Sequence, residues 1–355
     1  MANPVLVAGL AFAVPFVLSA LLTALAMRVS PRVGLVDAPG GRKAHERPMP
    51  LGGGVAMFLA WGVPLAAVLV LAGAGGPFGE FAARARPLGL ILAGGFVIML
   101  LGLLDDAFDL SPAVRLAVQV AVASGLYLAS HELRVTLFAG WSVFSFLYTV
   151  LWIVGITNAF NFLDNTDGLS AGVALVASVV LAIVGFQSHQ ELMAWLALAF
   201  AGATGGFLLF NFPPARIYMG DAGGLFLGFV LSVLTILFTF YESGDAPSGR
   251  LYSVLMPLFI LALPVFDTLT VVAIRLREGR PVWRGDRSHF SHRLLAIGMS
   301  KRETVVFIYL VTFCLGLAST LLGSLDEAGA VVILLVGVII FVLIALLERA
   351  GRRRN

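Results

Sequence analysis

Long apolar runs recur along the chain, and short polar or glycine-rich segments separate them. A helix needs about 20 mainly apolar residues to cross about 30 Å of hydrocarbon. By that measure the pattern predicts eleven membrane-spanning helices, at residues 4–27, 51–73, 87–104, 113–130, 141–160, 168–187, 191–211, 222–241, 251–274, 303–323 and 329–347. We therefore expect an all-α, polytopic membrane protein in which residues 1–355 form a single membrane-embedded domain.

The composition supports a membrane protein and excludes several other classes. Charged residues make up 12% of the chain and hydrophobic residues 59%, and the mean hydropathy is +0.98, whereas a soluble domain carries about 25% charged residues. The net charge of +3 is too small to indicate a nucleic-acid partner. Because Cys314 is the single cysteine, no intramolecular disulfide is possible, and its apolar surroundings predict a packing role.

Basic residues are distributed unevenly between the two sides of the membrane. The segments after odd-numbered predicted helices, together with the C-terminal tail, hold 19 of the 23 Lys and Arg residues. By the positive-inside rule this side faces the cytoplasm. We therefore expect the N-terminus outside and the C-terminus in the cytoplasm. The first predicted helix has no basic residue before it and is long for a signal-peptide core, so we expect it to be retained.

The first segment on the predicted cytoplasmic side combines basic residues with glycines. Lys43 and His45 lie near a glycine run at residues 52–54, where backbone N–H groups can approach a ligand. The run lacks the Lys-Ser/Thr ending of a P-loop. A positively charged turn at the lipid surface is the alternative explanation.

Three carboxylates end the third predicted helix. If the helix continues for one turn, Asp105 and Asp109 share a face and Asp106 lies beside them. Carboxylates this close repel one another, and a divalent cation or a basic partner would offset the repulsion. A water-exposed helix end is the alternative, although acidic residues at a helix C-terminus oppose the helix dipole.

Amides and carboxylates follow the fifth predicted helix at helical spacing. Asn158, Asn161 and Asn165 are predicted to share one face, and Asp164 and Asp167 are three residues apart. Such groups are costly in lipid unless they are satisfied. Helix capping would account for one or two of the five, so the pattern predicts a polar site.

The segment between the seventh and eighth predicted helices contains Asn211, Arg216 and Asp221. Glycines on both sides of Asp221 expose it and permit close approach of a ligand, although Asp221 could instead cap the next helix. Arg216 is a candidate partner for a phosphate group.

Two further polar features lie near the long basic cytoplasmic loop predicted at residues 275–302. Asp267 lies inside the ninth predicted helix, where a carboxylate indicates a functional site unless it pairs with a buried donor or lies at the interface. In the loop, His289 and His292 are three residues apart. Zinc would need further ligands that do not cluster here. Histidine and arginine beside an acidic site fit pyrophosphate recognition better.

Together these clusters resemble the polyprenyl-phosphate N-acetylhexosamine-1-phosphate transferases of glycosyltransferase family 4. The resemblance covers most of the chain and rests on five motifs in order. The motifs are Arg42-Lys43 with the glycine run 52–54, Asp105-Asp106, Asn158-x-x-Asn161-x-x-Asp164-x-x-Asp167-Gly168, Asn211-x-Pro-Pro214 to Met219-Gly220-Asp221, and Asp286-x-x-His289-x-x-His292.

The resemblance implies an activity. It implies transfer of a sugar 1-phosphate from a UDP-N-acetylhexosamine to polyprenyl (undecaprenyl) phosphate, with release of UMP, at the start of cell-envelope glycan synthesis. It also implies Mg²⁺ as the cofactor, with Mn²⁺ as a substitute, and a multi-pass protein of the inner membrane whose active site faces the cytoplasm. A homodimer is compatible with the resemblance.

Roles for single residues follow from the same resemblance. Asp221 is expected to be the main Mg²⁺ ligand and Asp106 a second one. Asp105 and Asp106 are expected to handle the acceptor phosphate, with Asp105 as a candidate proton acceptor. The remaining candidate substrate-binding residues are Lys43, Asn158, Asn161, Asp164, Asp167, Asn211, Arg216, His289, His292 and Arg293. We favour direct attack by the acceptor phosphate over a covalent aspartyl intermediate, because direct attack needs no further nucleophile.

The histidine motif bears on the identity of the donor. The branch that uses UDP-MurNAc-pentapeptide has three consecutive histidines in this loop, and this chain lacks that run of three. The loop resembles the UDP-GlcNAc branch, which usually has His-x-His-His, although Ser291 replaces the middle histidine here. UDP-MurNAc-pentapeptide transfer is the alternative activity. A secondary transporter is the alternative from another class, but the polar clusters lie at helix ends on one side and no inverted repeat is evident.

Overall fold

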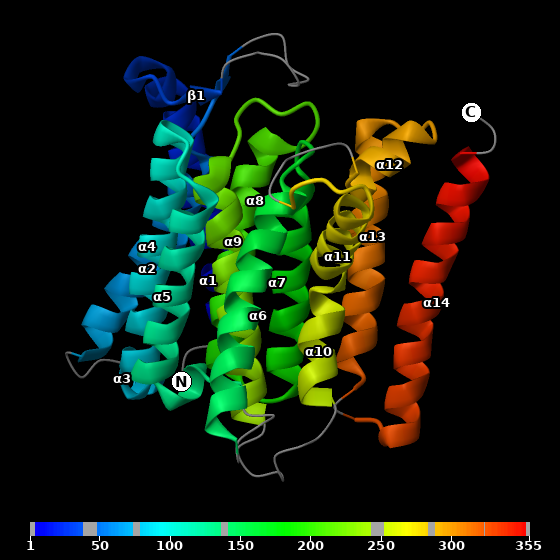
Figure 1. Ribbon diagram of the computed structural model, residues 1–355. Helices are drawn as coiled ribbons and strands as arrows, with labels where there is room; N and C mark the ends of the chain where they lie inside the picture. Colours follow the sequence, from blue (N-terminus) through cyan, green and yellow to red (C-terminus); the bar gives the residue numbers. More distant parts are fainter. Residues whose placement is uncertain are drawn as a thin grey trace.

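A computed structural model describes residues 4–37, 48–73, 79–135, 141–242, 252–282, 288–322 and 324–352. Helices dominate this part of the chain (Figure 1). In chain order the elements are α1 (Pro4–Val29), η1 (Ser30–Val33), β1 (Val36–Asp37), β2 (Met49–Pro50), α2 (Gly53–Gly73), α3 (Gly79–Ala83), α4 (Ala85–Phe108), α5 (Pro112–Ala129), η2 (His131–Leu133), α6 (Ser142–Leu163), α7 (Leu169–Gln187), α8 (Glu191–Asn211), α9 (Gly220–Glu242), α10 (Tyr252–Ile260), α11 (Ala262–Arg277), α12 (Phe290–Ala296), α13 (Lys301–Thr320) and α14 (Glu327–Arg352).

Ten of the described helices are long and apolar enough to cross a membrane, which confirms a polytopic, all-α protein. The predicted span at 251–274 is not one continuous helix, because α10 ends at Ile260 and α11 begins at Ala262. Proline explains the break: Pro264 has no N–H with which to bond the carbonyl group of Ile260. The predicted separation of 168–187 from 191–211 is confirmed by α7 and α8.

Helix α9 forms the centre of the bundle. Its apolar window within Gly220–Thr239 is entirely buried, as expected for a helix that is hydrophobic on all sides. α9 packs against α4 and α6. A Cβ atom at Gly228 would lie 2.5 Å from the carbonyl oxygen of Ile156, so glycine is required for this close approach of α6.

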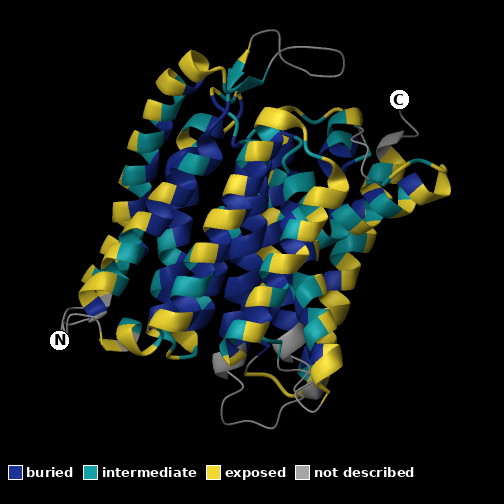
Figure 2. Cartoon of the chain, turned by 60° about the vertical axis from the view of Figure 1, so that its left-hand side comes forward, coloured by how far each residue is buried: buried dark blue, intermediate teal, exposed yellow. Residues whose placement is uncertain are grey.

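The outer faces of the surrounding helices are apolar and exposed (Figure 2). Phe108 is 71% exposed and Leu151 69% exposed, as expected for side chains that contact lipid. Cys314 also lies on an exposed face of α13. The predicted packing role of Cys314 is therefore wrong within this chain, because the apolar run around it faces lipid as well as the core.

The polar segments gather at one end of the bundle. Figure 1 shows β1, α12 and the end of α14 at that end, whereas α1 begins at the opposite end. β1 and β2 pair antiparallel there, with Val36 opposite Pro50. The arrangement brings loops that are far apart in the sequence to one surface.

Candidate functional site

Three helix ends meet closely at this surface because glycines allow it. A Cβ atom at Gly102 of α4 would lie 2.4 Å from the backbone nitrogen of Ala222, and one at Gly54 of α2 would lie 2.2 Å from that of Gly223. Both contacts leave room only for glycine. The ends of α2 and α4 therefore abut the first turn of α9.

The glycine run at 52–54 packs against the protein. The N–H groups of Gly53 and Gly54 donate to the carbonyl groups of Tyr218 and Met219, at 3.2 and 3.0 Å. Our expectation that this run offers its amides to a ligand was therefore wrong for these two, since the segment before α9 already occupies them. Lys43 and Asp286 lie outside the described residues.

Asp106 caps the N-terminus of α9. Its Oδ1 accepts the N–H of Asp221 at 2.8 Å, and its Oδ2 accepts the N–H of Ala222 at 3.2 Å. Gly220 has φ +70°, and a Cβ atom there would lie 2.3 Å from Asp106 Oδ2. The alternative that Asp221 caps this helix is wrong, because Asp106 supplies the accepting oxygens and Asp221 lies in the first turn.

Arg115 joins two of the predicted carboxylates. Its Nη1 bonds the Oδ2 of Asp105 and lies 3.4 Å from the Oδ2 of Asp221. Asp105 also accepts the N–H of Leu110 at 2.8 Å. The Asp105 side chain is 2% exposed and that of Asp221 is 35% exposed, so Asp221 is the more accessible of the two.

Arg115 was not among the residues that sequence reasoning selected. A signal was present, because Arg115 is the only basic residue in the predicted span 113–130 and an intramembrane charge marks a functional site. The count of basic residues on each side of the membrane treated Arg115 only as a loop residue.

Asp109 lies apart from the other two carboxylates. α4 ends at Phe108, and Asp109 adopts φ +50° with an exposed side chain. The predicted shared face of Asp105 and Asp109 is therefore wrong, because α4 ends one residue before Asp109, which adopts a left-handed conformation.

The end of α6 and the turn that leads to α7 carry the second group of predicted residues. Asn158 exchanges hydrogen bonds with Gln119 of α5, a buried amide that sequence reasoning also missed. Asn161 lies against α9, where a Cβ atom at Gly224 would be 2.6 Å from its Oδ1. Asn165 is beyond the end of α6 and donates to the Phe162 carbonyl at 2.9 Å, so the predicted face of three asparagines is correct only for Asn158 and Asn161.

Negative charge accumulates around this turn. Burial, together with the charges of Asp106 and Asp167, raises the pKa of Asp164 to about 7. Burial also raises the pKa of Tyr218 to about 12, with further contributions from Asp167, Asp37 and Asp164. Four carboxylates from three segments of the chain thus influence one region.

Asp167 and Asn211 connect the loops of this region. Asp167 accepts the N–H of Ala215 at 3.3 Å and lies 3.5 Å from the Nζ of Lys301. Asn211 is buried; it accepts the N–H of Gly168 at 2.9 Å and donates to the Ile217 carbonyl at 2.8 Å. Both side chains hold the α6–α7 turn against the segment before α9.

Arg216 and Arg293 have protein partners elsewhere. Arg216 donates to the Leu209 carbonyl at 3.1 Å, and its guanidinium lies 4.9 Å from the ring centre of Phe210. Arg293 pairs with Glu348 of α14 at 3.1 Å. Among the described residues neither arginine pairs with Asp105, Asp106 or Asp221, and their roles in substrate binding stay predictions.

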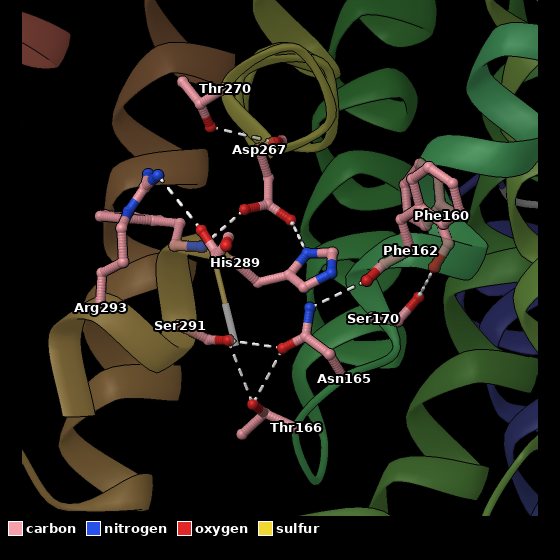
Figure 3. Close-up of polar contacts among 12 residues, drawn as sticks. Phe160, Phe162, Asn165, Thr166, Ser170, Asp267, Thr270, His289, Ser291 and Arg293 are labelled. Carbon is pink, nitrogen blue, oxygen red and sulfur yellow. Dashed lines mark hydrogen bonds and ion pairs between the residues drawn. The ribbon is translucent and has the colours of Figure 1, made fainter. Parts of the chain in front are cut away.

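The histidine motif lies beside the α6–α7 turn (Figure 3). Nδ1 of His289 lies 2.8 Å from Oδ2 of Asp267, and the N–H of Phe290 donates to Oδ1 of Asp267 at 2.6 Å. His289 is 4% exposed, whereas His292 is half-buried. Of the alternatives considered for Asp267, pairing with a buried donor is confirmed.

Comparison with known proteins supplies independent evidence. Residues 88–239 match glycosyl transferase family 4. The chain is 37% identical to the probable undecaprenyl-phosphate N-acetylglucosaminyl 1-phosphate transferase of Bacillus subtilis (strain 168), over 88% of this chain and 84% of that protein. It is 32% identical to the decaprenyl-phosphate N-acetylglucosaminephosphotransferase of Mycolicibacterium smegmatis, over 90% of this chain and 83% of that protein. The undecaprenyl-phosphate alpha-N-acetylglucosaminyl 1-phosphate transferase of Escherichia coli (strain K12) is 28% identical, over 83% of this chain and 78% of that protein.

Proposed function

Because this chain belongs to glycosyl transferase family 4, we propose that it transfers N-acetylglucosamine 1-phosphate from UDP-GlcNAc to a polyprenyl phosphate, with Mg²⁺ as cofactor. One observation carries the proposal: Asp105, Asp106 and Asp221 converge at the ends of α4 and α9, next to an apolar outer surface. The relatives named for N-acetylglucosaminyl 1-phosphate transfer support the sugar. Membership of an enzyme family decides against a secondary transporter.

The position of the carboxylates suits a lipid acceptor. Phe108 at the end of α4 and Val114 and Leu116 at the start of α5 are exposed apolar side chains beside the Asp105–Arg115 pair. A polyprenyl tail would lie along such a surface while its phosphate reaches the polar helix ends. A soluble nucleotide sugar would enter from the loops.

The carboxylate oxygens at this site suit Mg²⁺ as ligands. Asp106 is held by two backbone N–H groups, and the partly exposed Asp221 lies one residue into α9. Among the described residues no three acidic, histidine or cysteine side chains are grouped as a complete metal site, but Mg²⁺ usually takes one or two carboxylates together with waters and substrate phosphates. Asp221, with Asp106, would hold the ion, and Mn²⁺ would fit the same oxygens. When bound, the ion neutralises charge on the donor pyrophosphate.

The chain's own residues then orient the reactants. An oxygen of the acceptor phosphate forms a bond to the phosphorus that carries the sugar, the bond from that phosphorus to the UMP oxygen breaks, and UMP leaves with the electron pair. Both carboxylate oxygens of Asp105 already have partners in Arg115 and Leu110. We infer that Arg115 moves its donors from Asp105 to the acceptor phosphate, which a planar guanidinium binds well. That transfer would leave Asp105 available as the proton acceptor.

The proposed site faces the cytoplasm, where soluble UDP-sugars are found, and the protein resides in the inner membrane. The 19 basic residues that the sequence pattern assigns to the predicted cytoplasmic side support this orientation. In a Cys314→Ser background, single cysteines introduced at Arg134 and Arg280 should label from opposite sides of sealed vesicles. Labelling of both positions from the same side would contradict it.

A transfer assay tests the function directly. Purified protein is incubated with Mg²⁺, undecaprenyl phosphate and UDP-GlcNAc labelled with ³²P on the sugar-bearing phosphate, and we expect label in the lipid phase. A donor panel that includes UDP-MurNAc-pentapeptide distinguishes the alternative activity. If no UDP-N-acetylhexosamine yields labelled lipid, the transferase proposal is wrong.

A further inference from the structure

We propose that Asp267 is a positioning residue of the transferase: it holds the His289 ring in the Nδ1-protonated form, with Nε2 turned to Arg275, and so shapes the donor side of the site. This inference rests on the proposed function. It assigns a role to a carboxylate that lies apart from the Asp105–Asp106–Asp221 group, on α11 rather than α4 or α9.

Asp267 has two partners in the histidine segment. Its side chain belongs to the buried core at 1% exposure. One carboxylate oxygen accepts Nδ1–H of His289 at 2.8 Å, and the other accepts the N–H of Phe290, the first residue of α12, at 2.6 Å. Figure 3 shows both contacts reaching from α11 into the segment that carries the motif. Asp267 therefore determines both the rotation of the ring and the start of α12.

The partners of His289 specify its tautomer. A carboxylate can only accept a hydrogen bond, so Nδ1 must carry the proton. On the other side of the ring, Nε2 lies 3.5 Å from Nη2 of Arg275, which can only donate. The ring is thus a neutral bridge between a buried carboxylate and a buried guanidinium. Because both ring nitrogens of His289 face protein groups, His289 affects binding of the UDP-sugar through neighbouring residues rather than by direct contact.

Ser291 extends this arrangement to the α6–α7 turn. Its hydroxyl group donates to Oδ1 of Asn165, and the hydroxyl group of Thr166 lies 3.2 Å from it. The turn so held contains Asp164 and Asp167 and follows Asn161. The family resemblance implies that Asn161, Asp164 and Asp167 lie near the nucleotide, so Asp267 is connected to the nucleotide side and not to the helix ends expected at the acceptor phosphate. A defect at Asp267 should fall on donor binding.

The variant Asp267→Asn tests the idea with almost no change in shape. Since the N–H of Phe290 can only donate, the asparagine oxygen stays with it and the amide NH₂ turns towards Nδ1. The proton of His289 must then move to Nε2, where it points at an N–H group of Arg275 that can also only donate. Loss of one buried hydrogen bond to a charged group changes an equilibrium about tenfold or more, so we expect the KM for UDP-GlcNAc to rise by about that factor. The KM for polyprenyl phosphate should stay within about twofold.

Thr268→Val is the matched control. Thr268 is the next residue of α11, valine has nearly the same volume, and the Thr268 hydroxyl group has no hydrogen-bond partner among the described residues. Both KM values should be unchanged in this variant. A purely structural role for Asp267 predicts instead a lower folded fraction and a lower apparent kcat, with both KM values unaltered.

Nitrogen NMR of the protein labelled with ¹⁵N-histidine reads the tautomer without any assay of activity. The chain has five histidines, and the signals of His289 are those lost in His289→Gln. We expect Nδ1–H in the wild type and loss of that signal in Asp267→Asn. An Nε2–H signal in the wild type, or a wild-type donor KM in Asp267→Asn, would overturn the proposal. A wild type that transfers no sugar phosphate would overturn the proposed function and the donor role with it, whereas the NMR result bears on Asp267 alone.

Discussion

The carboxylate cluster at the ends of α4 and α9 and the Asp267–His289 cluster beside α12 use similar residues but differ in how their charges are balanced. In the first, Arg115 contacts both Asp105 and Asp221, and Asp106 depends on backbone N–H groups. In the second, each oxygen of Asp267 has its own donor. The first cluster has more negative charge than its described basic partner neutralises. In the second cluster, both oxygens of the single carboxylate already accept a hydrogen bond.

This difference separates two kinds of functional residue. Clustered carboxylates with too little positive charge are stabilised when a cation and a phosphate ligand arrive. A buried polar group with every partner in place keeps its geometry and leaves nothing for a ligand to satisfy. We therefore assign chemistry to the first cluster and positioning to the second.

The largest expected effect comes from Asp221→Asn. Removing the partly exposed carboxylate of Asp221 removes the expected main Mg²⁺ ligand, and since such an ion contributes several kcal/mol to the transition state, kcat should fall about a thousandfold. Asp109→Asn makes the same change at an exposed carboxylate nearby and should remain active. A fully active Asp221→Asn enzyme at high Mg²⁺ concentration would show that the metal assignment is wrong.

Arg115→Gln tests the charge balance of the first cluster. The buried Asp105 would lose its cation, at a cost of about 1–3 kcal/mol in the free energy of unfolding, and turnover should fall about a hundredfold with the lost phosphate contact. The double variant Asp105→Asn/Arg115→Gln should regain stability without regaining turnover. Arg32→Gln, at an exposed arginine of η1, serves as the control. Recovery of turnover in the double variant would mean that the pair serves folding alone.

A pH series tests the surroundings of the first cluster, because the pKa of Asp164 in the α6–α7 turn is raised by burial and by the charge of Asp106. With the pKa of Asp164 raised to about 7, its carboxyl group holds a proton below that pH and releases it above. A cation binding beside it competes with this proton, so the apparent affinity for Mg²⁺ should rise about tenfold from pH 6 to pH 8. The measurement is the Mg²⁺ concentration for half-maximal activity at each pH. Asp164→Asn should remove this dependence, and an unchanged slope in that variant would exclude Asp164 as its source.

The smallest effect is expected for Ser291→Ala. The variant loses the contact with Asn165, and a single hydrogen bond contributes about 0.5–1.5 kcal/mol. The KM for the donor should therefore rise about threefold, with kcat nearly unchanged. Ser324→Ala changes an exposed serine between α13 and α14 and should have no effect. A larger effect on the acceptor KM than on the donor KM would break the proposed division of the site.

Much of the fold could be predicted because membrane helices follow a simple length rule. Ten of the eleven predicted spans correspond to long apolar helices among the described residues, although several helix ends differ from the predicted ones by a few residues. The break between α10 and α11 was not predicted, although Pro264 was visible, because a proline either kinks or ends a helix depending on what packs against it. Asp109 and Asn165 were misplaced for a related reason, since each lies just beyond a helix end that local capping determines.

The chemistry was predicted less evenly. The structure brings together Asp105, Asp106 and Asp221, which the sequence singled out because carboxylates at the ends of apolar helices are costly; their catalytic roles stay predictions. Arg115, Gln119 and Asp37 were missed, since nothing local marks which partner a side chain will meet. For example, Asp106 and its hydrogen-bond partner Asp221 are 115 residues apart in the sequence.

The sequence by itself determined that the chain crosses a membrane many times, and that its polar residues collect on one side. The first follows from the cost of placing polar groups in hydrocarbon, which acts on each segment separately, and the second from the uneven distribution of basic residues between the predicted loops. Only the tertiary structure decided that Asp106 caps α9, that Arg115 bridges two carboxylates, and that Asp267 holds His289. These pairings depend on how closely helices approach. Glycines such as Gly102 and Gly54 allow that approach, but they do not specify the partner until the helices are packed.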